Sequence, residues 1–164
     1  MTTSKFVTAL LAALLTLIGF ASSASADPMT NQNVRNDIQK TLGFVPQFFQ
    51  KLPDGMLPGT WEEMKGLQLS PSTALDGRSK ELVGLAVAAQ VPCRYCIVAH
   101  TEFAKLNGAT DLEIREAIAL ASFTRSMSTL LNGMQVDEPQ FRRDVDRLVK
   151  NAKSAAKQEA VARR

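Results

Sequence analysis

The stretch from Asp76 to Gly108 has a helical pattern that a proline interrupts near its middle. It begins charged and becomes almost wholly apolar over residues 82–89, which fits a helix buried on nearly all sides. Pro92 ends that helix, because proline lacks a backbone donor and disfavours helix in the residue before it. Proline does suit the first turn of a helix, so a second helix should begin near Cys93.

The rest of the sequence is also helical in pattern, and no run of alternating residues bounded by Asn-Gly or Asp-Gly indicates a hairpin. Gly43 and Gly108 are placed as helix C-caps, and Thr110-x-x-Glu113 is a capping box. We expect an all-α protein, a compact bundle of five to six helices. The predicted helices span residues 31–42, 56–69, 76–90, about 93–107, 111–131, and from about 137 onward.

The first 26 residues have the pattern of an export signal. Lys5 precedes an apolar run, Phe6 to Phe20, and small residues follow, ending in Ala24-Ser25-Ala26. A retained membrane anchor is the alternative, but the single lysine and the small-residue end favour cleavage. We therefore predict a signal peptide over 1–26, one domain over 27–164, and a periplasmic or secreted protein that keeps no membrane segment after cleavage.

Charge is spread unevenly along the chain, whose formal net charge is +3. From Arg142 to Arg164 there are eight Lys or Arg residues and three Asp or Glu residues. Such a tail could contact nucleic acid or anionic lipid. No aromatic residues are interleaved for base stacking, so we interpret it as the solvated face of a terminal helix and expect no nucleic-acid partner.

The decamer VPCRYCIVAH, residues 91–100, contains both cysteines and the only histidine of the 164-residue chain. On a helix starting near Pro92, residues Cys93, Cys96 and His100 fall at positions i, i+3 and i+7, on one stripe of one face. Cysteines at i and i+3 also have Cα atoms close enough to form a disulfide.

A structural disulfide and a metal site are two possible uses of this decamer. Closing a four-residue loop stabilises a protein by only about 2 kcal/mol in the chain-entropy model, so a disulfide here would be a weak structural link. Zinc would need a second pair of ligands, and the chain has no further Cys or His to supply them. Both uses are therefore disfavoured.

Redox chemistry is the third possible use, and local features favour the reactive thiolate. The helix N-terminus is electropositive near Cys93, Arg94 adds a charge, and His100 lies one turn beyond Cys96. Position near the helix end makes Cys93 the more acidic thiol on physical grounds. By itself, Glu81 fits either an exposed glutamate of a first helical turn or a proton carrier that meets His100 if the chain folds back.

Four residues together form a recognisable pattern. Glu81, Cys93, Cys96 and His100 have the spacing E-x11-C-x2-C-x3-H, which resembles the signature of the AhpD-like alkylhydroperoxidases of the carboxymuconolactone decarboxylase family. The resemblance extends from about residue 43 to about residue 133. It implies an all-helical fold, assembly into trimers or hexamers, and thiol-dependent reduction of hydroperoxides.

The resemblance also implies a role for each residue. Cys96 would attack the peroxide, Cys93 would resolve the product into a disulfide, and Glu81 with His100 would relay protons. No cofactor or metal is implied, and an external dithiol would reopen the disulfide. An exported thiol-disulfide oxidoreductase acting on proteins and a non-catalytic redox-sensing module are the alternative functions, and a lactone decarboxylase fits least because its chemistry needs no cysteine pair.

Overall fold

The computed structural model describes residues 30–163, so the predicted signal peptide lies outside the described residues. Within that range every regular element is helical, which confirms the all-α class. Seven α-helices and one π-helical segment are present there, slightly more than the predicted five to six. The chain divides at Gly59 into two compact units, which are described separately below.

The first unit contains α1, Asn31–Leu42, and the short α2, Gln47–Gln50. The side chain of Thr30 caps the start of α1, and Gly43 ends it with a φ of 84°, a left-handed conformation that glycine adopts at little cost. The predicted bounds of this helix are confirmed. Sequence patterns did not predict the four-residue α2, which follows Pro46.

The structure differs from the predicted helix over 56–69 in the second half of that range. An α-helix, α3, covers Leu57–Glu63 across the boundary between the units, and a π-helical segment, η1, covers Met64–Gln68. Leu69 donates its backbone N–H to the carbonyl of Met64, five residues back, at 2.9 Å. Such wide turns are rare and occur often at functional sites. Gly66, a poor α-helix former, lies within this one.

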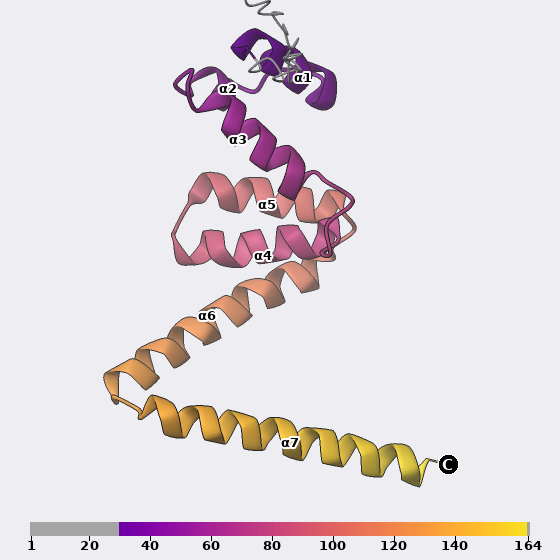
Figure 1. Cartoon of the computed structure of the whole chain (residues 1–164), viewed down its shortest axis with the longest axis vertical. Coiled ribbons are helices and arrows are strands. Elements are labelled where there is room, and N and C mark those ends of the chain that lie inside the picture. Colours follow the sequence, from indigo (N-terminus) through magenta and orange to yellow (C-terminus); the bar gives the residue numbers. More distant parts are fainter. Residues whose placement is uncertain (1–29, 164) are drawn as a thin grey trace, which may run out of the picture. The chain divides into compact units, whose positions relative to one another are not determined.

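The centre of the second unit is a pair of helices, α4 (Gly77–Gln90) and α5 (Arg94–Leu106), which lie side by side in Figure 1. Asp76 caps α4 by accepting the backbone N–H of Ser79 at 2.7 Å, and this bond holds the pKa of the Asp76 carboxyl below its ordinary value. The buried core around this pair is formed by Leu85, Ala104, Ala109 and Ile114, with Leu82 and Ile97 packed against it.

The expectation that residues 82–89 are buried on nearly all sides was wrong. Val83 and Val87 are 55% and 56% exposed. The helix α4 packs against α5 and against α6, Asp111–Gly133. Two neighbouring helices cover only part of a helix surface, so the remaining apolar side chains of α4 face outward.

The last two helices begin where the sequence predicted. The predicted capping box of Thr110 and Glu113 is present at the start of α6, and the Thr110 backbone N–H bonded to Glu113 holds the pKa of that carboxyl below its ordinary value. The helix α7, Glu138–Ala162, starts after the cap Asp137 and has no buried residue. None of the helices within residues 30–163 is long and apolar enough to cross a membrane.

Candidate active site

The two cysteines lie at the start of α5 and form a disulfide. Cys93 is the N-cap residue, and its sulfur accepts the backbone N–H of Cys96 at 3.3 Å. The Cα atoms are 5.3 Å apart, within the usual range for a disulfide. The predicted start of the second helix at Cys93 is therefore confirmed, and the helix end supplies a backbone donor to one of the two sulfurs.

A tight connection between α4 and α5 sets this position. The backbone N–H of Cys93 donates to the carbonyl of Ala88 at 3.0 Å, so the chain leaves α4 and enters α5 within a few residues. Ile97 then donates to the carbonyl of Cys93 at 2.9 Å, which forms the first turn of α5. Pro92 lies between the two helices, where its missing N–H costs no helical hydrogen bond.

Glu81 and His100 meet across the two helices. The Nδ1 atom of His100 on α5 lies 2.7 Å from Oε2 of Glu81 on α4. Glu81 is only 5% exposed, so its carboxylate is buried and is not the exposed first-turn glutamate that local sequence allowed. A buried carboxylate needs hydrogen-bond partners, and the imidazole of His100 is one of them.

Gly84 makes this approach possible, although sequence reasoning did not select it. A Cβ atom at residue 84 would lie 2.5 Å from Cε1 of His100 and 2.7 Å from each ring nitrogen. Any larger residue would therefore occupy the space of the imidazole. Gly84 follows Glu81 by three residues, which places both on the same face of α4. That spacing was the one sequence signal that could have identified this glycine.

Gln68 is a second residue that sequence reasoning missed. Its Nε2 atom donates to Oε1 of Glu81 at 2.6 Å, so both oxygens of the buried carboxylate have partners. Gln68 is the last residue of η1 and is separated from Glu81 by thirteen positions. Nothing in the local sequence distinguishes it from the other glutamines, because the contact depends on the path of the chain between η1 and α4.

The surface around the disulfide is partly apolar. Cys93 and Cys96 are both half-buried, whereas the side chains of Tyr95 and Val98 are 74% and 65% exposed. The guanidinium of Arg94, expected to assist a thiolate, lies 5.0 Å from the centre of the Tyr95 ring and donates to its hydroxyl at 3.1 Å. No group of three or more possible metal-ligating side chains occurs in the part of the chain that the structure describes.

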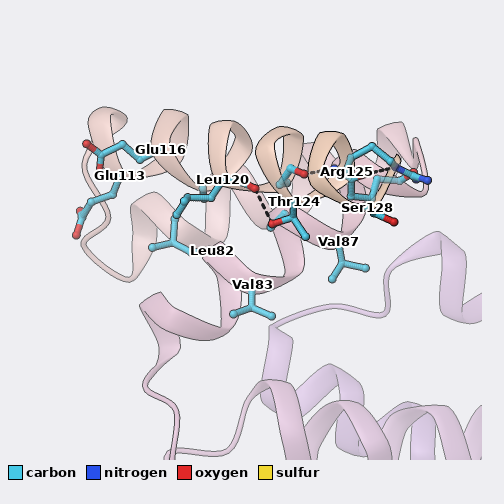
Figure 2. Close-up of a pocket in the computed structure, with 13 residues that line it drawn as sticks. Leu82, Val83, Val87, Glu113, Glu116, Leu120, Thr124, Arg125 and Ser128 are labelled. Carbon is cyan, nitrogen blue, oxygen red and sulfur yellow. Dashed lines mark hydrogen bonds between the residues drawn. The ribbon is translucent and has the colours of Figure 1, made fainter. Parts of the chain in front are cut away.

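A separate groove of about 720 Å³ runs between α4 and α6 and contains none of the four predicted site residues. Figure 2 shows Leu82, Val83 and Val87 of α4 below the ribbon of α6, which carries Leu120 and Thr124. Charged side chains stand at its ends, with Glu113 and Glu116 at one end and Arg125 at the other. The lining is otherwise mainly apolar and open to the surface.

Three comparisons place the chain among known proteins. A sequence model of the carboxymuconolactone decarboxylase family matches residues 57–138, a range that includes Gln68, Glu81, both cysteines and His100. The crystal structure of the alkylhydroperoxidase AhpD core from Rhodospirillum rubrum is similar, with 31% identity and a TM-score of 0.59. That match covers 68% of this chain and 85% of the other.

A curated relative from Paracoccus denitrificans, "Uncharacterized protein 4 in cox locus", is 43% identical over 53 residues. Those residues are 32% of this chain and 48% of the relative, so the match spans about half of the relative's length. The family match covers the helical pair and the disulfide. The chain belongs to the carboxymuconolactone decarboxylase family and is an AhpD-like member of it.

Proposed function

We propose that this protein reduces hydroperoxides with the Cys93–Cys96 pair and needs no cofactor besides an external dithiol. The observation that carries the proposal is the position of the disulfide one helical turn before His100, whose ring is bonded to the buried Glu81. A cysteine pair next to a buried acid–base pair can both accept electrons from a dithiol and move protons. The similarity to an alkylhydroperoxidase supports hydroperoxides as the substrate class.

The first step begins from the reduced pair. His100 takes the proton of the Cys96 thiol, and the Glu81 carboxylate stabilises the resulting imidazolium. The Cys96 thiolate attacks the terminal oxygen of the peroxide, so an S–O bond forms while the O–O bond breaks. The imidazolium returns its proton to the departing alkoxide, which leaves as an alcohol. Cys96 has lost two electrons and is a sulfenic acid.

The second step regenerates the disulfide state that the structure contains. The Cys93 thiol gives up its proton and attacks the sulfur of the Cys96 sulfenic acid, so an S–S bond forms while the S–O bond breaks. The hydroxyl leaves with that proton as water. Two thiols of an external dithiol then reduce this disulfide and become a disulfide themselves. Both cysteines are only half-buried, which supports access by such a donor.

Stopped-flow mixing of the reduced full chain with cumene hydroperoxide tests the proposal. We expect thiol loss much faster than that of free cysteine at the same pH, and we expect Cys96→Ser to abolish it. In Cys93→Ser a sulfenic acid should accumulate on Cys96. Thiol loss no faster than that of free cysteine would refute the proposed activity.

The same variants test which cysteine reacts first. The Cys93 sulfur accepts the Cys96 backbone N–H, so a Cys93 thiolate would also gain support from the helix end. A sulfenic acid trapped on Cys93 in Cys96→Ser, together with none on Cys96 in Cys93→Ser, would reverse the two roles.

Thiol-disulfide exchange with proteins is a second candidate function. It is favoured by the exposed apolar side chains of Val91, Tyr95 and Val98 around the disulfide, since a protein substrate could pack on them. Rapid exchange between the reduced chain and a protein disulfide, combined with slow reaction with cumene hydroperoxide, would favour this function over the first.

We also propose that the chain is exported and acts outside the cytoplasm, on the basis of the Lys5 to Ala26 pattern. N-terminal sequencing of the protein recovered from the periplasm or medium should begin near Asp27. Recovery in the cytoplasm with Met1 retained would contradict export and would widen the set of possible dithiol donors.

Assembly into a homo-oligomer, a trimer or hexamer, is a further proposal. The apolar groove between α4 and α6 leaves Val83, Val87 and Leu120 more than half exposed, and a second copy of the chain would cover such side chains.

A further inference from the structure

The amide of Gln68 is hydrogen-bonded to one carboxylate oxygen of Glu81, and the ring of His100 is hydrogen-bonded to the other. We propose that Gln68 is a positioning residue. Its amide holds the Glu81 carboxylate in place and thereby sets which ring nitrogen of His100 carries the hydrogen. The catalytic consequence rests on the proposed peroxidase function, whereas the effect on the histidine does not.

The chemistry of the three groups gives the direction of the effect. The side-chain N–H groups of Gln68 can only donate, so the bond from Nε2 uses Oε1 of Glu81 as an acceptor. An ionised carboxylate can only accept, so the 2.7 Å contact to His100 requires a hydrogen on Nδ1. In the neutral ring Nε2 then carries the lone pair and is the nitrogen able to take a proton from a thiol.

Two neighbouring bonds hold the segment that carries Gln68. The π-helical turn closes through the bond from Leu69 to Met64, and the Nζ atom of Lys80 donates to the carbonyl of Ser70 at 2.7 Å. Lys80 is itself only 8% exposed and directly precedes Glu81 on α4. The backbone next to Gln68 is therefore tied to α4, and its amide reaches the carboxylate from an anchored position.

A purely structural role for Gln68 is the rival explanation. It predicts a less stable protein when the amide is removed, because Glu81 would keep one buried oxygen without its donor. It predicts no specific change in the hydrogen position on His100 or in the pH dependence of the reaction. These two quantities therefore separate positioning from stability.

The single histidine of the chain allows a direct measurement. Long-range ¹H–¹⁵N NMR spectra of the reduced full chain report which nitrogen of His100 carries hydrogen. Gln68→Met keeps the side-chain length but removes the donor. Gln90→Met is the matched control, since it removes an amide that donates to the carbonyl of Ala121 at 2.7 Å, away from Glu81.

We expect the native chain and Gln90→Met to have Nδ1–H as the main neutral form, and Gln68→Met to lose that preference. Thiol loss with cumene hydroperoxide at pH 7 should be about tenfold slower in Gln68→Met than in the native chain, the size expected for losing a bond to a charged group. The same Nδ1–H population in Gln68→Met as in the native chain would overturn the proposal. If Gln68→Met does not fold by circular dichroism, Gln68→Asn, with its shorter amide, takes its place in the measurement.

Gln68→Glu gives a second test through pH. Two adjacent carboxyls can share a proton at low pH, and the introduced one, when protonated, can still donate to Glu81. We expect the rate of this variant to fall, relative to the native rate, as rising pH removes the shared proton. A constant ratio of the two rates across pH would contradict the proposal.

Failure of the proposal and failure of the proposed function give different results. If the native chain consumes no peroxide but Gln68→Met loses the Nδ1–H preference of His100, the peroxidase function fails and the positioning role stands. If peroxide is consumed rapidly while the Nδ1–H population of His100 is the same in Gln68→Met as in the native chain, only the positioning role fails.

Discussion

The two sides of α4 differ in how their side chains are satisfied. On the side facing α5, the buried carboxylate of Glu81 has a partner on each oxygen, and Gly84 leaves room for one of those partners. On the side that lines the groove with α6, Val83 and Val87 remain more than half exposed. A buried polar group without partners costs free energy within the chain itself, whereas exposed apolar surface can still be covered by another molecule. The proposed chemistry uses the first side, and the proposed assembly uses the second.

Changing Glu81 should have the largest effect, and it tests the side that faces α5. Glu81→Gln keeps the shape but removes the charge that stabilises an imidazolium on His100. Because general acid–base catalysis contributes roughly 10²–10⁴-fold, we expect a loss of that order in the rate of thiol oxidation by cumene hydroperoxide. Glu102→Gln, which changes an exposed glutamate on α5, is the control and should react at the native rate.

Gly84→Ala should have the next largest effect. Replacing glycine by alanine in a helix interior normally stabilises the helix by about 1 kcal/mol. At residue 84 the added Cβ meets the His100 ring, so the ring must move away from Glu81. We expect thiol oxidation to slow by at least tenfold, together with a lower melting temperature.

Gly59→Ala is the matched control for that prediction, because its Cβ would meet nothing within 4 Å. This variant should react at the native rate. A native reaction rate in Gly84→Ala would mean that contact between His100 and Glu81 is not needed.

Substitutions on the groove side of α4 should change the oligomeric state of the protein and not its rate of thiol oxidation. Val83→Asp and Val87→Asp place a charge at exposed apolar positions of α4, and we expect them to dissociate the proposed oligomer. Multi-angle light scattering after size-exclusion chromatography measures this. Leu106→Asp, at an exposed residue outside the groove, should leave the mass unchanged. A native chain that is monomeric at micromolar concentration would contradict the proposed assembly.

The smallest expected effect concerns the helix caps at the starts of α4 and α6. The pKa values of Asp76 and Glu113 are lowered by backbone hydrogen bonds, so each carboxylate contributes stability above its unfolded pKa. That contribution is lost as the pH falls through about 4 and below. Thermal melts should show a decline over this range that is weaker in Asp76→Ala than in the native chain. An equal decline in the melting temperature of both proteins would show that the Asp76 cap does not contribute to the pH dependence of stability.

The helices themselves were largely predictable from local sequence. Capping residues such as Asp76, Thr110 and Asp137 determine where a helix begins through bonds to the next few residues, so their effect is visible in sequence. The π-helical turn that ends at Gln68 was missed, because it differs from an α-helical turn by one residue in its hydrogen bonding and not in its apolar pattern. The burial of residues 82–89 was overestimated, because hydrophobicity does not indicate how many neighbours cover a helix.

Sequence alone determined the chemical groups and their order. It located the cysteine pair and His100 on one stripe of one helix, the proline that separates this helix from the one before it, and the spacing to Glu81. Tertiary structure decided which groups meet. The contact between Glu81 and His100 needs α4 and α5 to pack closely enough that only glycine fits at residue 84, and the contact to Gln68 needs η1 to return to α4. Both contacts join residues more than ten positions apart, so they depend on the path of the chain in space, which local patterns do not encode.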